Sequence, residues 1–219
     1  MRASPTRLLL LGGMIALGAA LAGCGGSKSP AHSTVERKGG CLVVAKPPAH
    51  TVKESKPTAT LPANVRYRVT FTTNCGDFTV LLDQTQSPHT VASFVALVRN
   101  GFFDKTIFHR IAVGFVIQGG DPSQSGNGGP GYSTVDTPPS SARYTLGVVA
   151  MAKTDLEAPG TGGSQFFVVT AGNANLPPDY AIIGKVVSGL AVVRRIGRLG
   201  DDQQEPTMVV EIEKATVSS

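Results

Sequence analysis

One segment decides the fold of this chain: Phe108-His109-Arg110-Ile111-Ala112-Val113-Gly114-Phe115-Val116-Ile117-Gln118-Gly119-Gly120-Asp121. If residues 113 to 118 form a strand, successive side chains point to opposite faces. Val116 and Gln118 then share one face, and the other face carries Val113, Phe115 and Ile117. Arg110 precedes this strand in a shorter extended piece. Two strands that each place a polar side chain on a shared apolar face form a wall that binds and orients an uncharged ligand. The alternative is a pair of ordinary strands with a surface Arg and a surface Gln.

The residues around this segment predict short strands and two helices. Tyr67, Val69 and Phe71 alternate with polar residues, and the same alternation returns after an Asn74-Cys75-Gly76 turn, which predicts a β-hairpin with one buried face. A helix is predicted from Ser87, a residue suited to the N-cap, through Pro88 to Arg99-Asn100-Gly101. A second helix is predicted over 188–198. Further strands are predicted near Phe108 and at 113–118, 146–151, 165–169, 182–186 and 208–213. Many short strands with few helices favour a mainly β fold, a closed antiparallel barrel.

The first 64 residues have a different composition from the rest. Arg2 and Arg7 precede an apolar run from Leu8 to Leu21, which is too short and glycine-rich for a comfortable membrane span and predicts a targeting signal. The run ends in Leu21-Ala22-Gly23-Cys24, which resembles a bacterial lipoprotein signal. We therefore expect a signal peptide at 1–23, a lipidated Cys24, and a cell-membrane anchor on the extracytoplasmic face of a bacterial envelope. An ordinary secretory signal is the alternative.

Residues 24–64 predict a spacer, because their Pro, Gly, Ser and Lys cannot build a core. The short apolar piece Cys41-Leu42-Val43-Val44 is the part of the spacer expected to dock on the domain. Residues 65–217 predict one domain with its own core. Removing Arg2 and Arg7 with the signal would lower the net charge from +5 to +3, which is too mild and dispersed to indicate a nucleic-acid partner.

Two cysteines remain if Cys24 is lipidated, Cys41 and Cys75. In an oxidising compartment this pair would form a disulfide that closes a loop of about 34 residues, for which chain entropy predicts roughly 3 to 4 kcal/mol of stabilisation. Two free thiols are the alternative. No Cys-x-x-Cys pair is present and neither cysteine has neighbouring histidines, so a zinc site or thioredoxin-like chemistry is not expected.

Two blocks of the sequence resemble the signature of the cyclophilin-type peptidyl-prolyl cis-trans isomerases. The first comprises Phe108-His109-Arg110 and Gly114-Phe115-Val116-Ile117-Gln118-Gly119-Gly120-Asp121, and the second is Gly162-Gly163-Ser164-Gln165-Phe166-Phe167-Val168-Val169-Thr170. Met151-Ala152 stands between them. The resemblance extends over roughly Val65 to Val217. It implies an eight-stranded antiparallel barrel with a helix over each open end, and rotation of X–Pro peptide bonds without a cofactor or metal.

The resemblance also implies roles for individual residues. Arg110 and Gln118 would be catalytic, with Arg110 stabilising the twisted amide. The residues implied in substrate binding are Phe115, Val116, Ala152, Lys153, Gln165, Phe167, Leu176 and Tyr180. Tyr180 stands where many members carry His, and its hydroxyl would be the donor there. Strand parity places His109 opposite Arg110, so a structural, hydrogen-bonded His is expected. Parity also assigns Phe166 to the core.

The sequence therefore predicts a monomeric, membrane-tethered prolyl isomerase that acts on proline-containing segments of exported proteins. A second hypothesis keeps the fold but makes the protein a non-catalytic module or chaperone that binds proline peptides. A third makes it a structural lipoprotein, which an intact Arg and pocket argue against. The glycine-rich run Gly126-Asn127-Gly128-Gly129-Pro130-Gly131 lacks the Lys-Ser/Thr ending of a phosphate-binding loop and predicts a flexible loop beside the groove.

Overall fold

The computed structural model of the chain describes residues 36–219. The predicted signal peptide and Cys24 lie outside the described residues. Residues 36–219 belong to one compact unit. In this part of the chain, no helix has the length and apolar character needed to cross a membrane.

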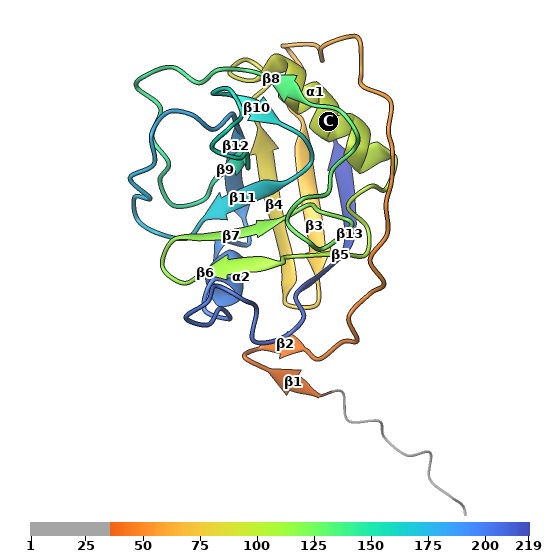
Figure 1. Cartoon of the computed structure of the whole chain (residues 1–219), viewed down its shortest axis with the longest axis vertical. Coiled ribbons are helices and arrows are strands. Elements are labelled where there is room, and N and C mark those ends of the chain that lie inside the picture. The colour runs from red at the N-terminus through yellow and green to blue at the C-terminus, as the bar shows by residue number, and fades with distance from the viewer. Residues whose placement is uncertain (1–35) are drawn as a thin grey trace, which may run out of the picture. The chain divides into compact units, whose positions relative to one another are not determined.

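A single nine-stranded antiparallel sheet forms most of the domain, in the order β5-β13-β3-β4-β12-β9-β11-β7-β6 (Figure 1). Its strands are β3 (Arg68–Thr73), β4 (Gly76–Leu82), β5 (Thr106–Ile107), β6 (Arg110–Ala112), β7 (Val116–Gly119), β9 (Val148–Met151), β11 (Phe166–Val169), β12 (Ile182–Ser188) and β13 (Glu211–Ser218). Two small two-stranded sheets pair β1 (Arg37–Lys38) with β2 (Cys41–Leu42), and β8 (Thr134–Val135) with β10 (Thr161–Gly162). The predicted hairpin is β3–β4, with Phe71 opposite Phe78.

The sheet curls into a half-barrel and does not close, so the prediction of a closed eight-stranded barrel is wrong. The two end strands, β5 and β6, are separated in the chain only by Phe108 and His109, and no strand pairing joins them within residues 36–219. The Phe108 amide continues the β5–β13 pairing by donating to Val210 O (2.9 Å), whereas on the unpaired edge of β6 the Ile111 amide donates to Gln204 O (2.8 Å). The segment that precedes β13 therefore occupies the edge that a closing strand would need.

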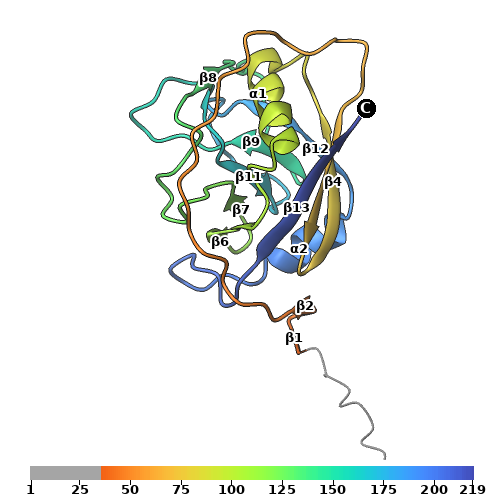
Figure 2. The same cartoon turned by 90° about the vertical axis from the view of Figure 1, so that its right-hand side faces the viewer.

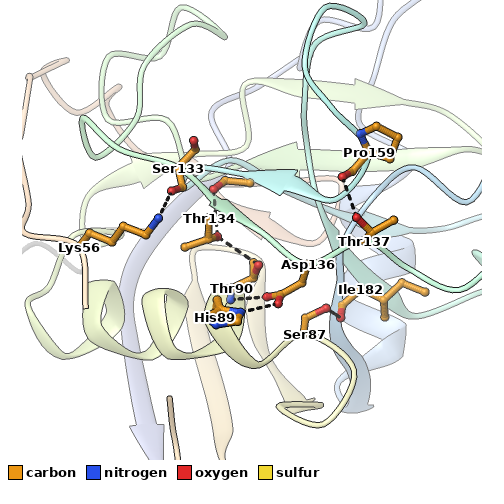
Figure 3. A network of polar contacts seen from close by, with 11 residues as sticks. Lys56, Ser87, His89, Thr90, Ser133, Thr134, Asp136, Thr137, Pro159 and Ile182 are labelled. Atoms are coloured by element: carbon orange, nitrogen blue, oxygen red, sulfur yellow. Dashed lines mark hydrogen bonds and ion pairs between the residues drawn. The ribbon is translucent and has the colours of Figure 1, made fainter. Parts of the chain in front are cut away.

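Two helices lie at opposite ends of the curled sheet (Figures 1 and 2). The first, α1 (Pro88–Arg99), has the predicted boundaries, and the second, α2 (Leu190–Ile196), is shorter than predicted. Ser87 occupies the N-cap position of α1 without capping it, because its hydroxyl donates to Ile182 O (2.7 Å). The cap comes from outside the helix: the Asp136 carboxylate accepts the Thr90 amide (2.6 Å) (Figure 3). A distant carboxylate thus satisfies a donor that the helix leaves open.

Alternate residues of the strands divide between two apolar clusters. Phe166 and Val168 of β11 belong to the main core, where aromatic rings pack closely: the Phe94 and Phe103 centroids are 4.8 Å apart. Phe167 and Val169 belong to a second cluster with Val116, Tyr144 and Ala150. The placement of Phe166 in the core follows the predicted parity. Val116 and Phe167 of the second cluster also line a surface cavity next to Arg110.

Residues 43–60 form an extended arm that lies along the domain rather than apart from it (Figures 1 and 2). The amides of His50 and Glu54 donate to Pro122 O and Pro130 O, each at 2.9 Å, and Lys56 Nζ donates to Ser133 O (2.8 Å). At the start of the arm, Cys41 and Cys75 are joined by a disulfide with an S–S distance of 2.04 Å. Residues 36–64 of the predicted spacer therefore belong to the same compact unit as the domain, although docking was expected only for Cys41-Leu42-Val43-Val44.

Candidate functional site

Arg110 is held at the edge of the sheet by neutral amides. Pairing of β6 with β7 places Arg110 opposite Gln118, and Arg110 Nη1 donates to Gln118 Oε1 (3.2 Å). Gln118 Nε2 donates in turn to Gln165 Oε1 (3.1 Å) on the segment leading into β11. Gln165 Nε2 donates to the carbonyls of Gly126 (2.8 Å) and Gly128 (3.0 Å). A continuous chain of hydrogen bonds thus connects the glycine-rich loop to the guanidinium.

This loop is organised by a buried acid. The Asp121 side chain is fully buried, and it accepts hydrogen bonds from the Ser123 hydroxyl and from the amides of Ser123, Ser125, Gly126 and Gly128. Burial alone would raise the pKa of Asp121, but these donors outweigh it and lower the pKa. The carboxylate therefore stays charged and gives the predicted flexible loop a defined shape.

A cavity of about 160 Å³ opens beside the guanidinium. It is lined by Arg110, Phe115, Val116, Gln118, Ala152, Lys153, Phe167, Leu176 and Tyr180. These are all of the residues predicted for catalysis and substrate binding except Gln165. Gln165 lies one hydrogen bond away and lines a neighbouring hollow with the glycine-rich loop. The predicted set is thus assembled around one cavity, in which apolar side chains lie beside the guanidinium of Arg110.

Aromatic packing fixes the far wall of the cavity. The Tyr180 ring meets the Phe167 ring edge to face, with centroids 5.5 Å apart. Tyr144, which the sequence analysis did not identify, holds this wall: its hydroxyl donates to Tyr180 O (2.8 Å) and accepts from Tyr180 N (3.0 Å). Burial is the main cause that raises the pKa of Tyr180, so its hydroxyl keeps its proton at neutral pH and remains a donor.

Phe115 reaches the cavity by a turn rather than by strand parity. The prediction placed it on the face opposite Val116, but β7 begins only at Val116. Phe115 closes a turn by donating its amide to Ala112 O (3.0 Å), with Gly114 at a φ of +72°. Ile117 points into the main core, as alternation requires. The turn therefore brings two consecutive side chains, Phe115 and Val116, to one cavity.

Two of the predicted binding residues already have partners. The Ala152 amide donates to Gln165 O (2.9 Å), so it is engaged within the sheet region and not free for a substrate. Lys153 Nζ donates to the carbonyls of Thr154 (3.1 Å) and Glu157 (3.2 Å) and lies 5.5 Å from the Tyr180 ring centroid. A cation near the ring face stabilises the position of both side chains.

His109 lies away from the guanidinium side of β6, as parity predicts. It lines a separate cavity of about 150 Å³ that Lys46 and Glu205 also line. Contrary to the expectation of a hydrogen-bonded His, neither ring nitrogen has a partner among residues 36–219, although both are buried. Burial lowers the pKa of His109 and outweighs the opposite effects of Asp121 and Glu205. The ring is therefore neutral at physiological pH.

Sequence reasoning missed Gln204, whose Oε1 accepts a hydrogen bond from Arg110 Nε (2.7 Å). The two residues are 94 positions apart, and Gln204 lies in a loop without alternation or a motif that could mark it. Among the described residues, no cluster of three or more His, Cys, Asp or Glu side chains is arranged to hold a metal ion.

Comparisons with known proteins agree on one family. A family model described as "Cyclophilin type peptidyl-prolyl cis-trans isomerase/CLD" matches residues 68–217. Peptidyl-prolyl cis-trans isomerase-like 1 of Neurospora crassa is 38% identical over 66% of this chain and 90% of its own length. Peptidyl-prolyl cis-trans isomerase A of Mycobacterium tuberculosis is 35% identical over 68% of this chain and 91% of its own.

Solved structures agree with the sequence comparisons. A crystal structure of a cyclophilin-type isomerase from Cryptosporidium parvum superposes with a TM-score of 0.65 and 31% identity, covering 71% of this chain and 99% of that one. A second structure of the same protein, in the presence of the dipeptide Ala-Pro, gives a TM-score of 0.64 and 32% identity over 69% of this chain and 99% of that one.

Proposed function

The chain belongs to the cyclophilin-type peptidyl-prolyl cis-trans isomerase family, and we propose that Arg110 drives the isomerisation from the rim of the cavity around Phe167. Rotation about a peptide bond has a barrier of about 18 to 20 kcal/mol, because the nitrogen lone pair is delocalised into the carbonyl. At X–Pro bonds the two isomers have similar energies but exchange over roughly tens to hundreds of seconds. A catalyst therefore has to stabilise the twisted amide more than either planar form.

The cavity provides both parts of such a catalyst. Phe115, Val116, Phe167 and Leu176 offer an apolar surface for the proline ring, and a volume of about 160 Å³ suits one small ring. In the twisted amide the lone pair returns to the prolyl nitrogen, which then accepts a hydrogen bond. Arg110 is a permanent cation with rigid donors at this rim, and its electrostatic preference for that nitrogen is larger where water is excluded.

One observation carries the proposal: the guanidinium of Arg110 lines the cavity beside Phe115, Val116 and Phe167 without an ion-pair partner among residues 36–219. Its partners, Gln118 and Gln204, are neutral, and neither of the two ion pairs found within residues 36–219 involves it. A carboxylate partner would cancel part of the field that the twisted amide requires. The arrangement thus favours transition-state stabilisation over simple anchoring of the side chain.

The test is the rate of cis-to-trans conversion of a proline peptide, read by an isomer-specific protease. We expect Arg110→Ala to lower kcat/KM by about 10²- to 10³-fold without a change in the circular dichroism spectrum or the denaturation midpoint. Arg68→Ala is the matched control, because Arg68 is an exposed strand arginine at the start of β3, outside the cavity. An Arg110→Ala variant with the wild-type rate would refute the role of the guanidinium. Wild-type rates equal to the spontaneous rate would favour the non-catalytic binding module.

We also propose that the enzyme acts outside the cytoplasmic membrane on proline-containing segments of exported proteins, anchored there by acyl chains on Cys24. The sequence Leu21-Ala22-Gly23-Cys24 after an apolar run supports this, and the Cys41–Cys75 disulfide is consistent with an oxidising compartment. Mass spectrometry of the mature N-terminus tests the anchor. A diacylglycerol adduct on an N-terminal Cys24 is expected, and an unmodified Cys24 or another first residue would refute it.

A further inference from the structure

The loop between α2 and β13 holds the side chain of Gln204 in a defined position. Residues 200–206, which we name the acidic loop, close on themselves through a bridge between Gly200 and Pro206. The Asp201 carboxylate accepts the amides of Gln203 (2.9 Å) and Glu205 (2.8 Å), and the Gln204 amide donates to Asp201 O (3.0 Å). The loop therefore has a defined shape even though most of its side chains are exposed.

Gln204, at the tip of this loop, joins β6 at two adjacent points. Its backbone carbonyl accepts the Ile111 amide (2.8 Å), and its side-chain oxygen accepts Arg110 Nε (2.7 Å). The guanidinium is thus held on one edge by Gln204 and at Nη1 by Gln118 (3.2 Å). Two acceptors on separate nitrogens restrict both the position and the plane of the guanidinium.

The backbone of Gln204 is strained. Its φ is +66°, in the left-handed region that residues with a Cβ enter at a cost. A glycine there would remove that cost but would offer no side chain to Arg110. Four non-glycine residues among the described residues have a positive φ, and of these Gln204 is the one whose side chain contacts Arg110.

Gln204, which accepts the hydrogen bond from Arg110, is an uncharged residue in a loop that carries three carboxylates. Asp201, Asp202 and Glu205 are exposed carboxylates within three residues of Gln204, yet none of them forms an ion pair with Arg110. An amide oxygen orients the guanidinium through a hydrogen bond without cancelling its charge. The loop therefore fixes Arg110 and leaves its field directed at the cavity.

We propose that Gln204 is a positioning residue for the isomerase reaction, which acts through Arg110 and does not touch the substrate. This inference rests on the proposed role of Arg110. Gln204 holds the guanidinium over the cavity before the substrate arrives, so its effect is on the rotation step. Binding of the proline ring depends on the apolar cavity and is independent of Gln204.

The test compares Gln204→Ala, Gln204→Gly and Gln204→Glu in the full chain, with Gln203→Ala as the matched control. Gln203 is the exposed neighbour in the same loop, and of its groups only the backbone amide makes a hydrogen bond there. We expect Gln204→Ala and Gln204→Gly to lower kcat about three- to tenfold with KM unchanged, the loss of one exposed hydrogen bond to a charged group. Gln204→Gly should at the same time unfold at an equal or higher denaturant concentration.

The Gln204→Glu variant separates the effect of positioning Arg110 from the effect of the charge next to it. It keeps an acceptor near Nε but adds a negative charge, so kcat should fall despite a stronger contact. A second measurement reports the contact directly: the NMR signal of the Arg110 Nε–H should be protected from solvent exchange in the wild type and in Gln203→Ala, and lose protection in Gln204→Ala.

Three results would overturn the inference. They are wild-type kcat in Gln204→Gly, an equal loss of kcat in Gln203→Ala, or a loss of kcat that follows the loss of stability across the set. Arg110→Ala measured in the same assay separates this failure from failure of the proposed function. If Arg110→Ala is inactive and Gln204→Gly is fully active, only the positioning role falls, whereas an active Arg110→Ala removes both.

Discussion

Removal of the Cys41–Cys75 disulfide should destabilise the domain, mainly because the unfolded chain gains conformational entropy when the cross-link is absent. The bond joins residues 34 positions apart. For a loop of this length the chain-entropy relation gives about 3.8 kcal/mol at 25 °C. For a domain of this size such a change lowers the thermal midpoint by roughly 8 to 15 °C. Both cysteines are buried, at 0% and 2% exposure, so replacement by Ala adds only a small packing loss and leaves no unpaired hydroxyl.

The assay is urea denaturation of Cys41→Ala, Cys75→Ala and the double variant in a Cys24→Ser background, which prevents exchange with a third thiol. Each single variant loses the bond completely, so the double variant should be less destabilised than the sum of the two singles by about the same 3.8 kcal/mol. Additive effects, or single variants that each cost less than about 1 kcal/mol, would refute the argument. Two reactive thiols in the unreduced, unfolded protein would show that the bond does not form.

Two further predictions concern titration and capping. Because burial lowers the pKa of His109, the imidazole takes up a proton at higher pH in the unfolded state than in the folded state. The stability that the neutral His109 ring contributes is therefore present above about pH 6.5 and is lost as the pH falls below it. Denaturation midpoints at pH 7 and pH 5 should therefore differ less in His109→Gln than in the wild type, and equal differences would contradict the neutral, buried state of the ring. Asp136→Ala should cost about 1 to 2 kcal/mol, because the Thr90 amide at the start of α1 loses its acceptor. Asp77→Ala, at an exposed position of β4, should change the free energy of unfolding by less than about 0.5 kcal/mol, and equal losses in the two variants would contradict the capping role.

Local features of this protein could be predicted from its amino-acid pattern. Alternation of apolar and polar residues predicted the β3–β4 hairpin, and helical spacing with Pro88 predicted α1. Parity divided Phe166 from Phe167 between the core and the cavity, and the family motifs placed the residues that surround the cavity. The hairpin, the helix and the parity of β11 depend on neighbours within a few positions, where side-chain direction follows from backbone geometry. The cavity residues, by contrast, were identified through the family resemblance.

Contacts between segments far apart in the chain became visible only in the folded domain. The arm at 43–60 was predicted as a spacer because its composition cannot build a core, yet its backbone amides bind Pro122 and Pro130. The open sheet, the Asp136 cap on α1 and the contact of Gln204 with Arg110 likewise join residues far apart in the chain. Such contacts produce no periodic pattern of apolar residues in the sequence. They depend on the order of the strands and on loops whose hydrogen bonds form only when the sheet has curled.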